Sequence, residues 1–150
     1  MKQNETGFTL LELIVVVFIV SVLAAVVFPS ISRTGSSDME SEARKIATLL
    51  RYLNDNAVAS KATYPLKFEI REQKLSWTGP DGERSEKVKT LKAVYLQSRG
   101  EVRDSELIVF FGPLGLQENL EVRLGDNEKD IRVVMNAVSG RAKILTGDEK

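Results

Sequence analysis

The sequence contains no cysteine and no histidine among its 150 residues. Without cysteine there can be no disulfide framework, no thiolate metal ligand and no cysteine nucleophile. Without histidine the chain lacks the side chain that most often serves as a general base or metal ligand near neutral pH. Most familiar hydrolase chemistry is excluded, and we expect no enzymatic activity, no metal and no cofactor.

The chain also has no excess of charge of either sign. Lys plus Arg and Asp plus Glu both number 21, which gives a formal net charge of zero. A neutral chain has no bulk attraction to nucleic acid, so we do not expect nucleic acid as a partner. The length fits one globular domain, and an apolar content of 43% is enough to bury a core without disulfide bonds.

The apolar residues are concentrated in residues 8–28 (FTLLELIVVVFIVSVLAAVVF), where Glu12 is the only charged residue. As a helix this segment measures roughly 31 Å, close to the ~30 Å hydrocarbon core of a membrane, so we predict a transmembrane helix. A core helix that is apolar on all sides would have to be surrounded by protein, so a buried core helix is disfavoured. In residues 1–7 Lys2 is offset by Glu5, so the positive n-region of a secretory signal peptide is missing, although residues 22–24 could form a weak cleavage site. A simple signal anchor is the third alternative.

Glu12 is the informative residue of this segment. An ionised carboxylate in a transmembrane helix costs about 2.5–3.5 kcal/mol and is usually retained for a function. No Lys or Arg lies in the same segment, so its partner must come from another chain, from interfacial water or from a new chain terminus. Cleavage between Gly7 and Phe8 would create an α-amino group one helical turn before Glu12.

The segment GFTLLE, residues 7–12, resembles the processing motif of type IV pilins and type II secretion pseudopilins. The resemblance implies that a prepilin peptidase cuts after Gly7 and methylates the new amino terminus at Phe8. It also implies that Glu12 neutralises the terminal amine of a neighbouring subunit during filament assembly. Pro29 resembles the helix-kinking proline of family members, and an ordinary helix boundary is the alternative.

After the apolar run, the small and polar residues 29–37 predict a bend or hinge. Ser37 and Glu40 have capping-box spacing, which predicts that a second, amphipathic helix starts there. Its apolar stripe comprises Met39, Ala43, Ile46, Ala47, Leu50, Leu53 and Ala57. The charged residues mostly off this stripe, which we expect in water, are Glu40, Glu42, Arg44, Lys45, Arg51 and Asp55.

From Tyr64 onward the apolar period changes to two, and turn residues punctuate the chain. We predict six or seven short strands within residues 64–70, 74–78, 88–96, 106–111, 120–124, 131–137 and 141–145. The continuous apolar run at 106–111 predicts a central strand, and we expect Trp77, Phe110 and Phe111 in the core. Short connections favour antiparallel pairing, so the fold class is α+β with the helix packed on one face of an antiparallel β-sheet.

This order of parts resembles the type IV pilin-like fold, in which a long N-terminal helix is half transmembrane and half packed on an antiparallel β-sheet. Residues 43–51 leading to 57–59, and residues 110–115, are similar to minor pseudopilins of the GspH/FimT family. The resemblance divides the chain into a leader peptide (1–7), a transmembrane helix (8–28), a bend or hinge (29–37) and a periplasmic α+β domain (38–150).

The resemblance implies a minor pseudopilin, a structural subunit of the pseudopilus that helps export folded proteins across the outer membrane. It implies a single-pass protein of the bacterial inner membrane with a cytoplasmic N-terminus, which later enters the pseudopilus. The implied partners are other pseudopilins or pilins, prepilin peptidase/methyltransferase, the inner-membrane assembly platform, the lipid bilayer, and secreted substrates or the outer-membrane secretin. The alternatives are a FimT-like minor pilin of a type IV pilus and a membrane-anchored periplasmic binding module or enzyme.

Three further sets of residues have a functional and a plain interpretation. Asp126, Glu128 and Asp130 alternate in a turn and could hold Ca²⁺, but Ile131 stands where an EF-hand-like loop needs glycine, which favours a solvated turn. Arg141, Lys143 and Lys150 form a thin basic tail that could contact DNA, as in some FimT-type pilins, but Asp148 and Glu149 interrupt it, which favours a neutral face. Glu118 and Glu121 show no partner group in the sequence.

Overall fold

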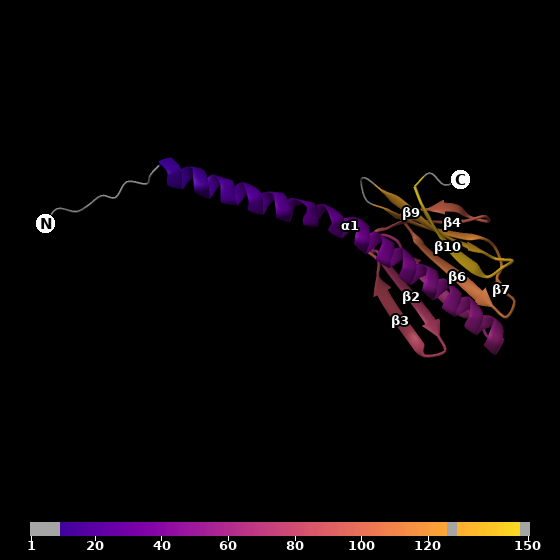
Figure 1. Cartoon of the computed structure of the whole chain (residues 1–150). Helices are drawn as coiled ribbons and strands as arrows, with labels where there is room; N and C mark the ends of the chain where they lie inside the picture. The colour runs from indigo at the N-terminus through magenta and orange to yellow at the C-terminus, as the bar shows by residue number, and fades with distance from the viewer. Residues whose placement is uncertain (1–9, 126–128, 148–150) are drawn as a thin grey trace. The chain divides into compact units, whose positions relative to one another are not determined.

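The computed structural model describes residues 10–125 and 129–147, and within its helix it describes the side chains of residues 10–22 and of residue 38 onward. The chain forms two compact units, residues 1–37 and 38–150. One helix, α1 (Leu10–Ser60), extends through both units (Figure 1). All β-strands that the structure describes belong to the second unit.

The helix α1 corrects one expectation from the sequence. Its helical backbone continues across residues 29–37, so residues 39–57 belong to the same helix and no new helix starts at Ser37. Gly35 lies in this stretch, and a glycine inside a helix costs only about 1 kcal/mol relative to alanine. This cost is small for a helix of 51 residues. The bend at 29–37 itself stays a prediction.

The strands follow the helix in order and are joined mostly by short turns. Those described are β1 (Tyr64–Glu69), β2 (Lys74–Gly79), β3 (Gly82–Lys87), β4 (Leu91–Leu96), β5 (Gly100–Val102), β6 (Glu106–Gly112), β7 (Gly115–Leu116), β8 (Leu120–Gly125), β9 (Asp130–Asn136) and β10 (Arg141–Thr146). The sequence had predicted fewer, because β3, β5 and β7 show no run of alternating apolar residues.

The strands form two antiparallel sheets instead of the one sheet expected. The first sheet has the order β3-β2-β1-β6-β7, and the second has the order β10-β9-β8-β4-β5. The chain leaves the first sheet after β3, returns for β6 and β7, and then completes the second sheet. The α+β class and the antiparallel pairing are confirmed. The division into two sheets depends on which strands pair, and periodicity alone does not specify pairing.

The C-terminal part of α1 lies across the strands, as Figure 1 shows. The seven apolar stripe residues predicted from the sequence are all at most 1% exposed, so this prediction is confirmed. Both sheets contribute to the same core, including Phe68 and Phe111 of the first and Val122, Val133 and Met135 of the second. One helix face therefore holds two sheets together.

Two of the three aromatic predictions hold and one is wrong. Phe111 is fully buried, and Trp77 is partly buried and packs against the core. Phe110, in contrast, is 57% exposed. Along β6 buried and exposed side chains alternate, because the strand covers the core with one face only. The continuous apolar run at 106–111 therefore does not mark a strand buried on both faces.

Glu42 anchors the segment that crosses from the first sheet to the second. Its carboxylate accepts hydrogen bonds from the backbone amides of Lys89 and Thr90, both at 3.0 Å, and from the Thr90 hydroxyl. We had expected Glu42 in water, but it is partly buried. The side chain fixes the crossover between β3 and β4 onto α1.

Asn54 connects the other end of the packed helix to β7 of the first sheet and lies beside the turn between β9 and β10. It is 7% exposed, and its Oδ1 accepts a hydrogen bond from the backbone amide of Leu116 in β7 at 3.1 Å. Gly115 and Gly140 leave the space that it occupies, since a Cβ at either would lie 2.8 or 2.7 Å from its amide atoms. Both glycines also have positive φ, so a side chain there would be strained as well.

Candidate functional site

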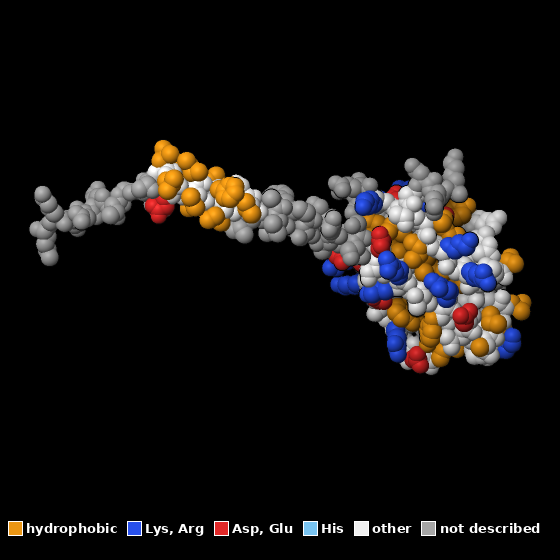
Figure 2. All heavy atoms as spheres, viewed as in Figure 1, with side chains coloured by type: hydrophobic (Ala, Val, Ile, Leu, Met, Phe, Trp, Pro, Cys, Tyr) orange, Lys and Arg blue, Asp and Glu red, His pale blue; other side chains and the backbone are white. Residues whose placement is uncertain are grey.

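The described start of α1 is apolar on all sides. From Leu10 to Val22 the large apolar side chains are between 46% and 77% exposed. Figure 2 shows them covering the visible face of this stretch. A helix that is hydrophobic all round is normally buried in protein or in a membrane, so this segment needs a covering that the described residues do not provide.

Glu12 lies in the first described turn of this apolar helix and is exposed. A carboxylate in the first turn interacts favourably with the positive end of the helix dipole. Of the other predicted assembly residues, Gly7 and Phe8 lie outside the described residues, and so does the side chain of Pro29. The roles predicted for these four residues stay predictions.

The predicted membrane segment, residues 8–28, is described only in part. Among the helical residues that the structure describes, none forms a stretch with the length and hydropathy needed to cross a membrane. The side chains of residues 23–37 are not part of that description.

The candidate calcium turn is also only partly described, because Asp126 and Glu128 lie outside the described residues. Asp130 opens β9, and its Oδ1 lies 2.9 Å from the Lys92 Nζ. Within residues 10–125 and 129–147, no three acidic side chains come together as a metal site would require.

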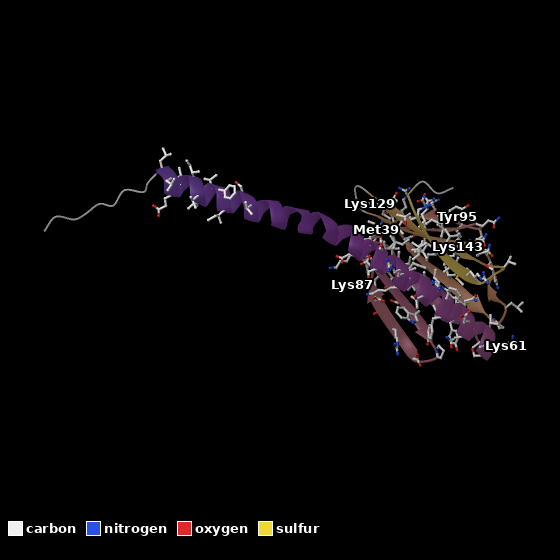
Figure 3. The ribbon with its side chains drawn as sticks, in the orientation of Figure 1. Met39, Lys61, Lys87, Tyr95, Lys129 and Lys143 are labelled. Atoms are coloured by element: carbon white, nitrogen blue, oxygen red, sulfur yellow. The ribbon has the colours of Figure 1, made fainter. Side chains whose placement is uncertain are left out.

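The basic tail predicted near the C-terminus is exposed where it is described. Arg141 and Lys143 lie on β10 with exposed side chains, and Lys143 is labelled in Figure 3. Lys150 lies outside the described residues.

Glu118 and Glu121 do not form a carboxylate pair. The Glu118 carboxylate accepts hydrogen bonds from the Ser98 amide at 2.7 Å and the Ser98 hydroxyl at 2.6 Å, and these bonds lower the pKa of Glu118. Glu121 accepts a hydrogen bond from the Arg123 Nε at 2.7 Å. Each carboxylate stabilises a local structure, and the two share no reactive site.

A groove that the sequence did not indicate lies between α1 and the β2–β3 hairpin. Its volume is about 530 Å³, within the range of small-ligand and side-chain pockets. Leu49 and Tyr52 of α1 and Trp77 of β2 give it an apolar lining. Arg44 and Lys45 of α1 and Arg84 of β3 add positive charge.

Two contacts fix the hairpin to the helix beside this groove. The Tyr52 hydroxyl donates to Asp81 Oδ2 at 2.8 Å, which raises the pKa of Tyr52. Lys45 Nζ donates to Glu86 Oε1 at 2.7 Å, and this bond raises the pKa of Lys45. The hairpin turn and the far end of β3 are thus both bound to α1.

The residues of the groove had separate interpretations in the sequence. Trp77 was assigned to the core, and Arg44 and Lys45 were assigned to a solvated helix face. The GPDG sequence at 79–82 is typical of a turn, but no strand was predicted directly after it, because the GERSEK sequence of β3 has no apolar alternation. These residues line one groove only because β3 pairs with β2.

Comparison with known proteins gives three matches. Residues 2–28 match the sequence family described as the prokaryotic N-terminal methylation motif. Over 68 residues the chain is 41% identical to type II secretion system protein H of Pseudomonas aeruginosa. This alignment covers 45% of the chain and 40% of the relative, so the chain spans less than half the length of that protein.

The third match is structural. The fold is similar to the crystal structure of the type IV minor pilin FimU of Pseudomonas aeruginosa, with a TM-score of 0.51. The superposition covers 77% of this chain and 97% of that chain, at 13% sequence identity. Similarity at this identity concerns the fold alone.

Proposed function

We propose that this chain, which is type IV pilin-like and similar to the GspH/FimT family, is a minor pseudopilin of a type II secretion system. In this role it is a structural subunit of the pseudopilus that helps export folded proteins across the outer membrane. The observation that carries the proposal is the match of residues 2–28 to the methylation motif, within which residues 10–22 form a helix with exposed apolar side chains.

The fold and the sequence similarity support the same assignment. The type IV pilin-like fold expected from the order of elements is confirmed by the match to FimU. The similarity to protein H favours secretion over the pilus, because that relative is named for the type II secretion system. The assembled role, substrates and partners of the whole protein are part of the proposal.

The proposed chemistry lies at the N-terminus. Prepilin peptidase/methyltransferase cleaves between Gly7 and Phe8 and methylates the new amine. Glu12 then pairs with the amine of a neighbouring subunit. Each charged group loses water when it enters an apolar bundle, and each recovers part of that cost through the other. Pro29 allows the helix to kink where it leaves the apolar segment.

The proposed location follows from the same segment. The protein starts in the inner membrane with a cytoplasmic N-terminus and a periplasmic C-terminal domain, and it then moves into the pseudopilus. The inner-membrane assembly platform and the apolar helices of other pseudopilins contact residues 8–28. The periplasmic domain contacts secreted substrates or the outer-membrane secretin.

Deleting the gene tests the proposal directly. We expect specific proteins to disappear from the culture medium while pili and twitching motility persist, and the wild-type gene to restore secretion. Unchanged secretion combined with loss of pili or twitching would replace the proposal with a FimT-like minor pilin, a role that shares the fold found in FimU.

The intact mass of the protein recovered from membranes tests the processing step. We expect a chain that begins at Phe8 and carries one additional methyl group. A chain that still begins at Met1, or one cut near Ala24, contradicts the proposal and leaves a signal anchor or a signal peptide.

A further inference from the structure

The strand β3 is an open edge of the first sheet. It is the last strand in the order β3-β2-β1-β6-β7, and no strand within the described residues lies on its other side. Five of its six residues are exposed. The opposite edge, β7, has only two residues and offers little backbone for pairing. A long exposed edge presents backbone groups on which another chain can pair.

Every second side chain of β3 points to the groove beside α1. Arg84 is directly opposite Trp77, and Glu86 is opposite the buried Leu75, so both share the face that is turned to the helix. Gly82 continues this face, and a Cβ there would meet nothing within 4 Å. There is open space next to Arg84 and the hairpin turn.

The charges of the groove favour an anion. Its lining carries three cationic side chains, Arg44, Lys45 and Arg84, and two acidic ones, Asp81 and Glu86. Glu86 binds Lys45, and Asp81 accepts the Tyr52 hydroxyl. The ion pair between the Arg84 Nη2 and Asp81 Oδ2 is 3.9 Å long, and the Arg84 side chain is 61% exposed. A guanidinium group with five N–H donors can bind a carboxylate through two parallel hydrogen bonds.

We propose that β3 and this groove bind an extended segment of a partner protein, which joins the first sheet as an additional strand. Its backbone pairs with β3, while an apolar side chain packs beside Trp77 and a carboxylate two residues away binds Arg84. The charged side chains of β3 disfavour pairing with a purely apolar strand. The partner segment is therefore recognised by the carboxylate that binds Arg84. This binding does not depend on the proposed secretion role. That role rests on the motif at residues 2–28, whereas every residue of the groove belongs to residues 38–150.

The experiment uses the full chain in detergent micelles and the fluorescence of Trp77. The chain has one tryptophan, so its emission reports on this groove alone. The probe is the synthetic peptide acetyl-TFTETTT-amide, which places Phe and Glu on one face of a strand. We expect a saturable change in Trp77 emission, with a matching heat of binding by calorimetry.

Three controls separate the parts of the proposal. Replacing the peptide Glu by Lys and the variant Arg84→Glu should each weaken binding at least about tenfold. The matched variant Lys143→Glu, on β10 of the other sheet (Figure 3), should bind as the wild type does. Two peptides with N-methyl groups on alternate amides complete the set, because only one pattern blocks the amides that face β3.

The results decide the inference at each step. Absence of saturable fluorescence and heat changes with the parent peptide overturns binding in this groove. Equal affinity of the Glu and Lys peptides overturns the role of Arg84. Equal behaviour of the two N-methylated peptides overturns strand addition, whereas loss of binding for one pattern only supports it. Circular dichroism of Arg84→Glu, and the intermediate affinity expected for Arg84→Lys, separate a local effect from unfolding.

Discussion

At the scale of single residues, the polar side chains that matter most bind a backbone amide far away in the sequence. Asn54 accepts the amide of Leu116, and Glu118 accepts the amide and hydroxyl of Ser98. A buried amide that loses its acceptor keeps the full cost of having left water. Asn54, whose bond to the Leu116 amide is buried, therefore contributes more to stability than the exposed ion pairs do.

Replacing Asn54 by Ala should lower the free energy of unfolding by about 1–3 kcal/mol, because the Leu116 amide loses its acceptor inside the core. Chemical denaturation of the full chain in micelles measures this change. Asn56→Ala is the matched control, since the Asn56 side chain donates to the Tyr52 carbonyl of its own helix. A similar loss for both variants would show that Asn54 has no special role.

The stability supplied by Glu118 should depend on pH. The hydrogen bonds from Ser98 lower the pKa of Glu118 in the folded state below its ordinary value of 4.5. The stabilisation is complete above that ordinary value and is lost as pH falls through the lower folded pKa. The difference in unfolding free energy between wild type and Glu118→Gln should therefore shrink as pH falls below about 4.5.

Denaturation midpoints measured across this pH range test the dependence on Glu118. Glu72→Gln, a change in the exposed turn after β1, provides the control for a general effect of removing one carboxylate. A difference between wild type and Glu118→Gln that stays constant with pH would contradict the assignment.

At the scale of elements, the contact between α1 and the crossover at residues 88–90 is the decisive link. Glu42→Gln removes the charge and half of the acceptor capacity that hold Lys89 and Thr90. We expect a loss of about 1–2 kcal/mol in unfolding free energy. Glu40→Gln is the matched control on the same helix, because its exposed ion pair with Arg44 contributes only about 0–0.5 kcal/mol. Equal losses of unfolding free energy in the two variants would show that Glu42 contributes no more than an exposed surface charge.

The elements also show what the sequence could and could not predict. The helix stripe was predictable residue by residue, because packing against a core imposes a period of 3.6 on one face. The strand β3 was not, because an edge strand beside a groove buries no regular set of apolar side chains. Phe110 was misplaced because an apolar side chain can remain exposed on the outer face of a sheet.

Some residues of the candidate sites could be predicted from the sequence and others could not. Gly7, Phe8 and Glu12 were indicated by one short contiguous motif. The groove joins residues 44–52, 77 and 84, which become neighbours only through the pairing of β2 with β3 and the packing of α1. Local patterns carry no information on such pairing.

At the scale of the whole molecule, the assembled filament gives Glu12 its proposed partner. Glu12→Ala should leave cleavage and methylation intact, because the proposed cleavage site lies before Phe8. Incorporation into pseudopili should fall at least about tenfold, since an amine left unpaired in an apolar bundle costs several kcal/mol. Intact mass and the amount of protein in sheared filaments measure the two effects.

The control for Glu12 lies on the same helix. The Ser21 hydroxyl bonds to the Val17 carbonyl of its own helix at 2.7 Å, so Ser21→Ala should assemble as the wild type does. Normal incorporation of Glu12→Ala would refute the pairing role.

The shared core has a consequence for synthesis. The stripe at residues 39–57 is translated before Val133 and Met135, which belong to the same core. The core around the helix therefore cannot be completed until translation has passed Met135. A product that stops before β9 would lack Val133 and Met135 and would leave part of its apolar helix face exposed to chaperones and proteases.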